Sequence, residues 1–332
     1  MSEAPDWLQR GFNRPLKDVS TLGDPRFANI YSPLYDADEV RKYMSSYYES
    51  QDGAQGQDAK LNLNDYYRRL LGEALERTGG LGASGPAPAI LEIGCGFGSA
   101  TIPLLELYPE SKLVASEFSL SMLQLLKGKL DGDLHRGRCA LLQLNAEDMD
   151  FHGESFDLVV GAAVLHHLFH PEKVLESCAR VLKPGGRAIF FEPFESGFDV
   201  VSLVYQSALS DPRRFLIDPR KRRYLQHCVS YWREMRSADK ASPFFAGADD
   251  KWLFPSSFFE RHAQSSNFRH CEMYGLDKSG RPFEALIRTH LEGNNVKSMP
   301  RWFWQIVDRH EDAFSDEQKK TLFTEGCVIL QK

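Results

Sequence analysis

ILEIGCGFG, the sequence of residues 90–98, is an apolar run that ends in three alternating glycines. This pattern predicts a strand that feeds a tight turn, because glycine tolerates positive φ and lets a ligand approach the backbone closely. An amphipathic segment follows at residues 99–107, so backbone amides at a helix start would face the ligand. Ser99 stands where a dinucleotide fingerprint has its third glycine, which argues against a nicotinamide oxidoreductase.

Further β-like runs alternate with helical segments along the chain. The runs lie at residues 112–116, 140–144, 156–160 and 187–192, and the last follows a helical segment at 171–182 and the breaker Lys183–Gly186. Such alternation predicts a mostly parallel sheet covered by helices. Glu117 ends the second run, roughly 20 residues past the glycine turn, where a carboxylate can accept both hydroxyls of an adenosine ribose.

Five motifs, in this order and spacing, resemble the class I S-adenosylmethionine-dependent methyltransferases. They are LEIGCGFG, SEFS, NAEDMDF, FDLVV with LHHL, and VLKPGG, within residues 85–195. The branch they resemble includes ubiquinone and menaquinone methyltransferases and many sugar and natural-product O-methyltransferases. The resemblance implies an α/β, Rossmann-like fold of seven strands, mostly parallel with the last strand antiparallel between the fifth and sixth. It also implies S-adenosyl-L-methionine as the cofactor.

The resemblance further implies which residues hold the cofactor. Glu92 and the Gly94–Gly98 backbone correspond to the part that holds the methionine moiety, and Glu117 to the ribose ligand. Asn145 stands where the family usually has an acid at the adenine edge. Its side-chain carbonyl can still accept a hydrogen bond from the adenine amino group. Alternatively, Asn145 forms a turn at the end of the strand. The expected cofactor-binding residues are Glu92, Gly94, Cys95, Gly96, Gly98, Glu117, Phe118, Met122, Asn145, Ala146, Glu147 and Ala162.

Two adjacent histidines, His166 and His167, follow the fourth expected strand, and Glu192 ends the fifth. Open α/β sheets bind ligands at this carboxyl edge, and histidine accepts a proton near neutral pH. In sugar O-methyltransferases that the pattern resembles, such positions serve general-base catalysis. We therefore predict that His166, His167 and Glu192 are catalytic. Because LHHL also occurs in enzymes that methylate carbon, simple packing against the methionine tail stays open for either histidine.

Metal binding is the other interpretation of this cluster, with His170 as a further ligand, and we predict no metal site. The six cysteines form no C-x-x-C pair, which argues against a disulfide scaffold or a zinc site. Cys95 fits the glycine turn as a small packing residue. His262, His270, His290 and His310 are isolated and are expected to be ordinary surface or core residues.

The composition is that of an ordinary globular protein, with 332 residues, 42% of them hydrophobic and 26% charged. A net charge of −6 gives no reason to expect a nucleic acid as partner, so a small-molecule acceptor is favoured. No apolar run approaches the roughly 18 residues of a membrane helix, and residues 1–10 lack a secretory pattern. We expect a cytoplasmic protein without membrane insertion, and the oligomeric state stays open, a homodimer included.

Four parts are expected along the chain: an N-terminal helical cap at 1–85, the cofactor-binding core at 86–195, a helical insertion or lid at 196–251, and a C-terminal part at 252–332 that completes the sheet and adds acceptor-pocket elements. The cap should contain helices at 38–49 and 64–77, the second opening at an Asn64 cap. The insertion should contain helices at 200–210 and 221–236. It also carries a basic block that either forms a solvated face, which we favour, or grips an anionic group of the acceptor: Arg213, Arg214, Arg220, Lys221, Arg222 and Arg223.

The sequence therefore predicts a methyltransferase that acts on a small molecule, on a hydroxyl with a histidine as general base. Two alternatives stay open. One is a C- or N-methyltransferase of a quinone, polyketide or amine-type metabolite, and the other is a noncatalytic module that binds the cofactor. The acceptor itself cannot be identified, because specificity would lie in the cap, the insertion and the tail, which carry no recognisable motif.

Overall fold

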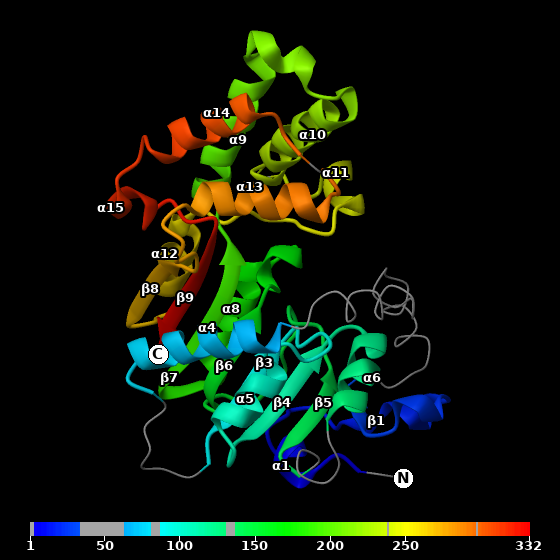
Figure 1. Ribbon diagram of the computed structural model, residues 1–332. Helices are drawn as coiled ribbons and strands as arrows, with labels where there is room; N and C mark the ends of the chain where they lie inside the picture. The colour runs from blue at the N-terminus through cyan, green and yellow to red at the C-terminus, as the bar shows by residue number, and fades with distance from the viewer. Residues whose placement is uncertain (1–2, 34–62, 81–86, 131–136, 238, 297) are drawn as a thin grey trace.

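The computed structural model describes residues 3–33, 63–80, 87–130, 137–237, 239–296 and 298–332. In these residues the chain forms a nine-stranded sheet with the order β1-β2-β5-β4-β3-β6-β7-β9-β8 (Figure 1). The strands are β1 Lys17–Asp18, β2 Ile30–Ser32, β3 Ala89–Ile93, β4 Lys112–Glu117, β5 Cys139–Gln143, β6 Phe156–Ala162, β7 Leu182–Pro193, β8 His270–Gly275 and β9 Glu325–Gln331.

The predicted α/β architecture is confirmed. Strands β3 to β7 are parallel, and β9 is antiparallel to both β7 and β8, between which it lies. These seven strands are the expected set. Two short strands, β1 and β2, extend the sheet beyond β5, so the count is nine rather than seven.

The two extra strands come from a part of the chain that the sequence assigned to a helical cap, and for this part the prediction was wrong. Ile30 and Tyr31 pair with Leu141 and Leu142 of β5, and both side chains are buried. A β-branched and an aromatic residue in succession favour an extended strand over a helix. The expected helix at 38–49 lies outside the described residues.

The described helices are α1 Asp6–Gln9, α4 Asn64–Arg77, α5 Thr101–Leu107, α6 Leu120–Lys129, α8 Pro171–Val181, α9 Glu195–Ser210, α10 Pro219–Met235, α11 Pro243–Gly247, α12 Ser256–Ser265, α13 Pro282–Gly293, α14 Arg301–Glu311 and α15 Asp316–Lys319. Helix α4 has the predicted bounds. Its predicted cap is wrong, since Leu63 occupies the cap position and no side chain caps the helix. Four turns of 3-10 helix complete the described elements: η1 Val19–Leu22, η2 Pro25–Phe27, η4 Leu165–His167 and η5 Pro212–Leu216.

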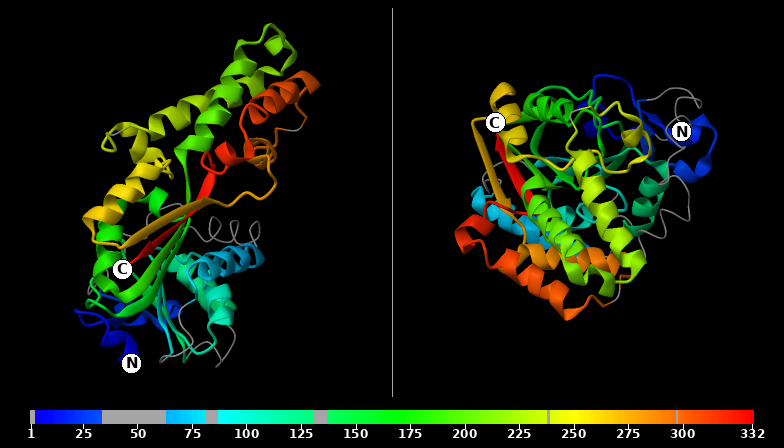
Figure 2. Two further views of the ribbon diagram at one scale, coloured as in Figure 1. Left: turned by 90° about the vertical axis from the view of Figure 1, so that its left-hand side faces the viewer. Right: turned by 90° about the horizontal axis from the view of Figure 1, so that it is seen from above.

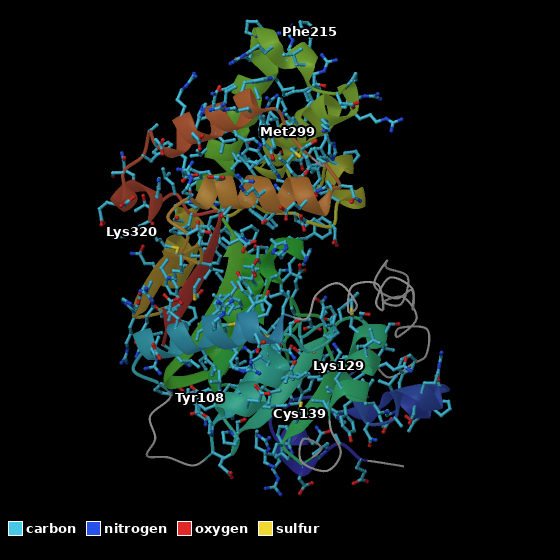
Figure 3. The ribbon with its side chains drawn as sticks, viewed as in Figure 1. Tyr108, Lys129, Cys139, Phe215, Met299 and Lys320 are labelled. Atoms are coloured by element: carbon cyan, nitrogen blue, oxygen red, sulfur yellow. The ribbon has the colours of Figure 1, made fainter. Side chains whose placement is uncertain are left out.

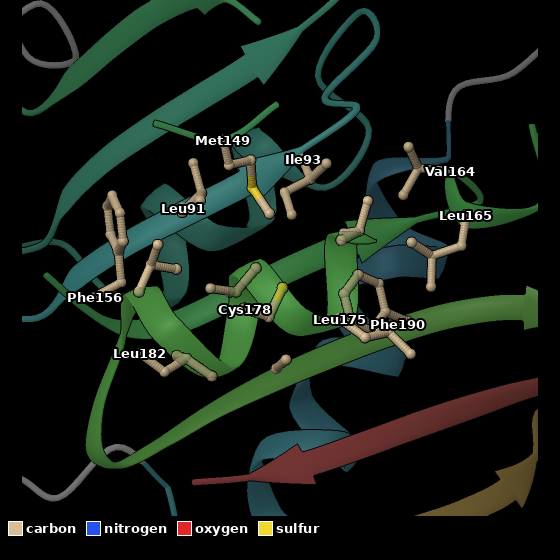
Figure 4. Packing of buried hydrophobic residues seen from close by; sticks show 14 of the residues in the cluster. Leu91, Ile93, Met149, Phe156, Val164, Leu165, Leu175, Cys178, Leu182 and Phe190 are labelled. Atoms are coloured by element: carbon tan, nitrogen blue, oxygen red, sulfur yellow. The ribbon is translucent and has the colours of Figure 1, made fainter. Parts of the chain in front are cut away.

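Alternate residues of the central strands pack against helices on opposite faces of the sheet, as the period of two requires. On one face, Leu91 and Ile93 of β3 belong to the same core as Leu175 and Cys178 of α8 (Figure 4). On the other face, Ile90 joins a second core to which α4, α5 and α6 contribute. The sheet is therefore buried on both sides, and ligands can approach it only at a strand end.

A layer of four helices, α9, α10, α13 and α14, stands beyond the carboxyl end of β7 and has a core of its own (Figures 1 and 2). Val204 and Tyr205 of α9, Trp232 of α10 and Phe303 of α14 are buried there. The two helices expected in the insertion are α9 and α10, and each begins earlier than expected. Helix α10 starts at Pro219 because the Asp218 side chain accepts the amide of Arg220.

The described residues include six free cysteines, five of them buried. Within the same residues, no helix combines the length and the hydrophobicity that crossing a bilayer requires.

Candidate active site

The glycine turn between β3 and α5 needs its glycines for two physical reasons. Gly94 has a φ of 65°, and a Cβ added there would lie 2.5 Å from Cγ2 of Val164. Gly96 has a φ of 52°, yet an added Cβ would meet no described atom within 4 Å. Cys95 between them is buried, and burial raises the pKa of its thiol, as the predicted packing role requires. The turn thus leaves open space above Gly96.

Glu117 borders this open space at the end of β4. Its Oε2 accepts the amide of Gly96 at 3.0 Å, and its Oε1 accepts the amides of Phe118 at 2.7 Å and Ser119 at 2.9 Å. These bonds fix the carboxylate beside the glycine turn. A carboxylate has about four acceptor positions, and these three amides take three of them, so the Glu117 carboxylate is held in one orientation beside the open space. The residues present therefore fit the adenosyl group that the motifs imply.

Glu92 is buried inside the turn rather than exposed to a ligand in the described structure. Its Oε2 accepts the hydroxyl of Thr101 at 2.6 Å, which ties β3 to the first residue of α5. Burial raises the pKa of Glu92 to about 8, because the charged form loses its hydration. A role toward the methionine moiety stays a prediction.

A small hollow of about 40 Å³ lies where the adenine was expected. Asn145 lines it, and its Oδ1 accepts the amide of Glu147 at 3.0 Å, so the turn-forming role is present. The Glu147 carboxylate instead accepts the amide of His170 at 2.9 Å. The hollow is lined by Arg14, Pro33, Phe118, Gln143, Leu144, Asn145 and Asp148.

Not all of the predicted cofactor-binding residues line that hollow. Met122 is buried near the start of α6 and does not line it. Ala146 and Ala162 pack against the two cores of the sheet. Arg14, which lines the hollow, was missed by the sequence analysis, because it comes from the N-terminal segment and belongs to no motif.

His166 and Glu192 form a direct pair at the carboxyl edge of β6 and β7. Nδ1 of His166 lies 2.7 Å from Oε2 of Glu192. The same carboxylate accepts the backbone amides of Val164 at 3.0 Å, Leu165 at 2.8 Å and His166 at 3.2 Å. Glu192 is buried and so holds both the 3-10 turn and the imidazole ring in place. This leaves Nε2 of His166 as the nitrogen that can exchange a proton.

The two histidines differ in their electrostatics. Burial opposes protonation of His166, but the neighbouring carboxylates, Glu192 first and then Asp250 and Asp249, outweigh it, so the pKa of His166 is raised. The pKa of His167 is lowered by burial and by its neighbour His166, whose ring centroid lies 4.0 Å away. When the two neutral rings take up one additional proton, His166 therefore accepts it before His167 does.

Asp250 approaches both histidines from the loop before α12. Its Oδ1 lies 3.5 Å from Nε2 of His166 and 3.5 Å from Nδ1 of His167. One ligand atom from each of these three residues lies within 4.8 Å of the others, a spacing that could hold a metal ion. The absence of a metal stays our prediction. Asp250 was not among the predicted residues, because nothing in its local sequence pattern marks it.

A cavity of about 300 Å³ opens beside the His166–Glu192 pair. It is walled by α4, by α9, α10 and α13 of the helical layer, and by the ends of β7 and β9. The lining residues are Tyr66, Tyr67, Leu70, Ala163, His166, Phe191, Glu192, Pro193, Phe198, Trp232, Met235, Asp250, Leu253, Leu276, His290 and Glu325. None of these is a lysine or arginine. The structure therefore brings His166 and Glu192 to the cavity but not His167.

His290 of α13 also lines this cavity, although its sequence context gave no signal. Among the described residues, its buried Nδ1 has no hydrogen-bond partner. Burial lowers the pKa of His290 to about 4, so the ring is neutral at physiological pH. Its position offers a polar contact to a bound molecule on the side opposite the sheet.

The family described as "Methyltransferase domain" matches residues 91–190. Residues 91–190 form a class I S-adenosylmethionine-dependent methyltransferase domain. The ubiquinone/menaquinone biosynthesis C-methyltransferase UbiE of Vibrio vulnificus is 31% identical over 123 residues, which are 37% of this chain and 47% of that protein. The demethylmenaquinone methyltransferase of Clavibacter sepedonicus is 34% identical over 103 residues, 31% of this chain and 40% of its own length.

The methyltransferase domain is thus shared with these relatives, while the chain spans about half of the UbiE length or less. Among solved structures, a phosphoethanolamine N-methyltransferase 2 of Haemonchus contortus has a TM-score of 0.49 at 12% identity, covering 88% of this chain and 60% of that one. A methyltransferase in complex with the Haloferax volcanii activator Trm112 has a TM-score of 0.49 at 15% identity and covers 88% of this chain and 96% of its own.

Proposed function

We propose that this chain transfers a methyl group from S-adenosylmethionine to a hydroxyl of a small molecule, with His166 as the general base. The observation that carries the proposal is the 2.7 Å contact between Nδ1 of His166 and the buried Glu192 carboxylate, at the wall of a 300 Å³ cavity. A carboxylate on one imidazole nitrogen fixes the tautomer and makes the other nitrogen a better base.

The donor side of the proposal rests on the glycine turn and Glu117. S-Adenosylmethionine supplies a methyl group on a sulfonium, so the leaving group needs no activation. Glu117 would accept the ribose hydroxyls, the open space above Gly96 would admit the adenosyl group, and Phe118 and Asn145 would border the adenine. The remaining task of the protein is alignment, which can lower the barrier by roughly 7 to 11 kcal/mol.

The acceptor side rests on the cavity. The acceptor oxygen gains the methyl group as its proton passes to Nε2 of His166, and Glu192 stabilises the imidazolium. The cavity is lined by aromatic rings and carboxylates and has no cationic side chain, so an uncharged acceptor fits it better than a phosphate or carboxylate. None of the basic block at 213–223 lines this cavity, so the proposed grip on an anionic acceptor group has no support there.

Replacing His166 tests the proposal. His166→Gln should lower turnover roughly 10²- to 10⁴-fold, the usual contribution of a general base, while donor binding is kept. His167→Gln is the matched control and should keep most of the turnover, because His167 does not line the cavity. Turnover is followed as S-adenosylhomocysteine release in the presence of a chelator. If methyl transfer stops in the chelator and needs an added divalent ion, the proposal that His166 takes the proton without a metal is contradicted.

C-methylation is the second candidate, because the similar UbiE proteins are C-methyltransferases of ubiquinone and menaquinone biosynthesis. In that case the acceptor carbon would take the methyl group, and His166→Gln should reduce turnover much less. Mass spectrometry of the product separates the two, since an O-methyl and a C-methyl group fragment differently. A cytoplasmic location and a homodimer stay predictions from the sequence.

A further inference from the structure

The connection between α9 and α10 forms an exposed apex on the helical layer, residues 211–223, which we call the tip. Phe215 is 69% exposed and Leu216 is 73% exposed, more than any other large hydrophobic residue of the described chain. Phe215 lies at the far end of the molecule from the sheet (Figure 3). Two adjacent large apolar side chains so exposed at a projecting point mark an interaction surface.

The tip is held in this form rather than being loose. Asp211 caps the 3-10 turn η5 by accepting the amide of Arg213, and Asp218 caps α10 by accepting the amide of Arg220. Ile217, the next residue after the exposed pair, is 1% exposed and belongs to the core of the helical layer. The fold therefore anchors Ile217 and directs Phe215 and Leu216 outward.

The tip is also the basic pole of an acidic chain. Residues 211–223 contain six basic and two acidic residues, which gives +4, whereas the whole chain carries −6. Both acids are used as caps, and Asp211 also pairs with Arg213. The guanidinium carbons of Arg214 and Arg222 lie 4.7 and 5.5 Å from the Phe215 ring centroid. Two of the positive charges thus lie against the Phe215 ring, while Arg213 contacts Asp211 and the Trp302 ring.

We propose that the tip docks on an anionic lipid bilayer, with Phe215 and Leu216 inserted among the headgroups and exposed arginines of the tip, such as Arg220 and Arg223, on lipid phosphates. Aromatic and leucine side chains enter the interface, and guanidinium groups bind phosphate in a bidentate manner. Binding of this kind needs no spanning helix. A nucleic acid would bind the arginines but would leave Phe215 and Leu216 in water. A protein partner is disfavoured as well, because a projecting apex offers little of the roughly 800 Å² that a stable protein interface buries per partner.

The test is co-sedimentation of the full chain with vesicles of phosphatidylcholine alone and of phosphatidylcholine mixed with phosphatidylglycerol. We expect binding to the mixed vesicles that is released by salt, and little binding to phosphatidylcholine. Phe215→Ser combined with Leu216→Ser should weaken binding about tenfold or more. Arg220→Gln combined with Arg223→Gln should do the same, since each basic residue near an anionic surface contributes roughly fivefold.

Leu203→Ser and Lys320→Gln are the matched controls, as these residues are an exposed leucine and an exposed lysine outside the tip. Both should bind like the unchanged chain. Circular dichroism verifies that each variant is folded. The proposal is overturned if the unchanged chain ignores the mixed vesicles, if the tip variants bind as well as the controls, or if the tip pair instead controls a concentration-dependent self-association.

Discussion

At the scale of single residues, the Glu192 carboxylate contacts both a histidine ring and the backbone turn that carries this histidine. The sequence predicts a catalytic Glu192, and in the structure its carboxylate contacts Nδ1 of His166. It also accepts three backbone amides of the turn that carries His166. The ring position and the turn geometry therefore depend on one buried carboxylate, which acts as a positioning residue.

This dependence predicts a specific pH profile. Because Glu192 raises the pKa of His166, the neutral base should be lost as the pH falls through a value above the ordinary 6.5. The acid limb of kcat/KM should therefore lie above pH 6.5. In Glu192→Gln the burial that lowers the pKa of His166 is opposed only by Asp250 and Asp249, so the limb should move to lower pH while kcat falls. An unchanged limb in this variant would contradict the pairing.

Glu92 predicts a pH dependence of stability that is separate from catalysis. Its pKa in the folded chain is raised from 4.5 to about 8, so the folded state binds the proton more tightly than the unfolded state. This contribution is complete below about pH 4.5, falls as the pH rises, and is lost above about pH 8. The thermal unfolding temperatures of the unchanged chain and of Glu92→Gln, both measured without cofactor, should therefore diverge as the pH is raised from 5 to 9.

The comparison at low pH, where Glu92 is protonated and uncharged, is the control for this measurement. Glutamine keeps the shape and can still accept the Thr101 hydroxyl, so Glu92→Gln should unfold at a similar temperature to the unchanged chain at low pH. If the unfolding temperatures of the two proteins follow the same curve from pH 5 to pH 9, Glu92 does not cause the pH dependence of stability.

At the scale of elements, the glycine turn predicts a large local effect. Gly94→Ala should destabilise the fold by about 1 to 3 kcal/mol from positive φ alone, and the clash with Val164 adds to this. Donor binding should be weakened as well. Gly72→Ala, in the interior of α4 with open space around it, should instead stabilise by about 0.5 to 1 kcal/mol. Chemical denaturation of both variants checks the pair, and equal effects would contradict the account.

The parallel strands of the core and the place of the glycine turn, Glu117 and His166 could be predicted from the sequence because local signals mark them, whereas the place of the antiparallel strand came from the family resemblance. Apolar runs, glycines with positive φ and strand-end carboxylates each mark their own position. Strands β1 and β2 were not predicted, because they have only two and three residues and exist through pairing with β5. Asp250 and His290 reach the cavity through tertiary packing, which leaves no local pattern.

At the scale of the whole molecule, the proposed donor site and the proposed acceptor cavity lie in different layers. The sheet edge carries the glycine turn and Glu117, whereas the acceptor cavity is closed largely by α4 and the helical layer. Parts of the chain outside the matched segment 91–190 line most of this cavity, so we expect them to set acceptor specificity. The same layer carries the exposed tip, so acceptor recognition and surface docking would share one set of helices.

This division predicts that a substitution in the helical layer can change acceptor binding without changing donor binding. His290→Phe should remove the unpartnered Nδ1 from the cavity and raise the KM for a hydrogen-bonding acceptor about tenfold, the value of one net hydrogen bond. The KM for S-adenosylmethionine should not change, because His290 lies away from the glycine turn in the sequence and in the fold. Equal changes in both constants would contradict the separation of the two layers.

Titration calorimetry with S-adenosylhomocysteine tests the central claim most directly, since the whole account requires the glycine turn and Glu117 to hold the adenosyl group. We predict binding at a single site for the unchanged chain and for His166→Gln, and a loss of affinity of roughly tenfold or more in Glu117→Ala, because charge-assisted hydrogen bonds to the ribose are removed. A folded chain that takes up no S-adenosylhomocysteine, or a Glu117→Ala variant that binds it equally well, would contradict the account.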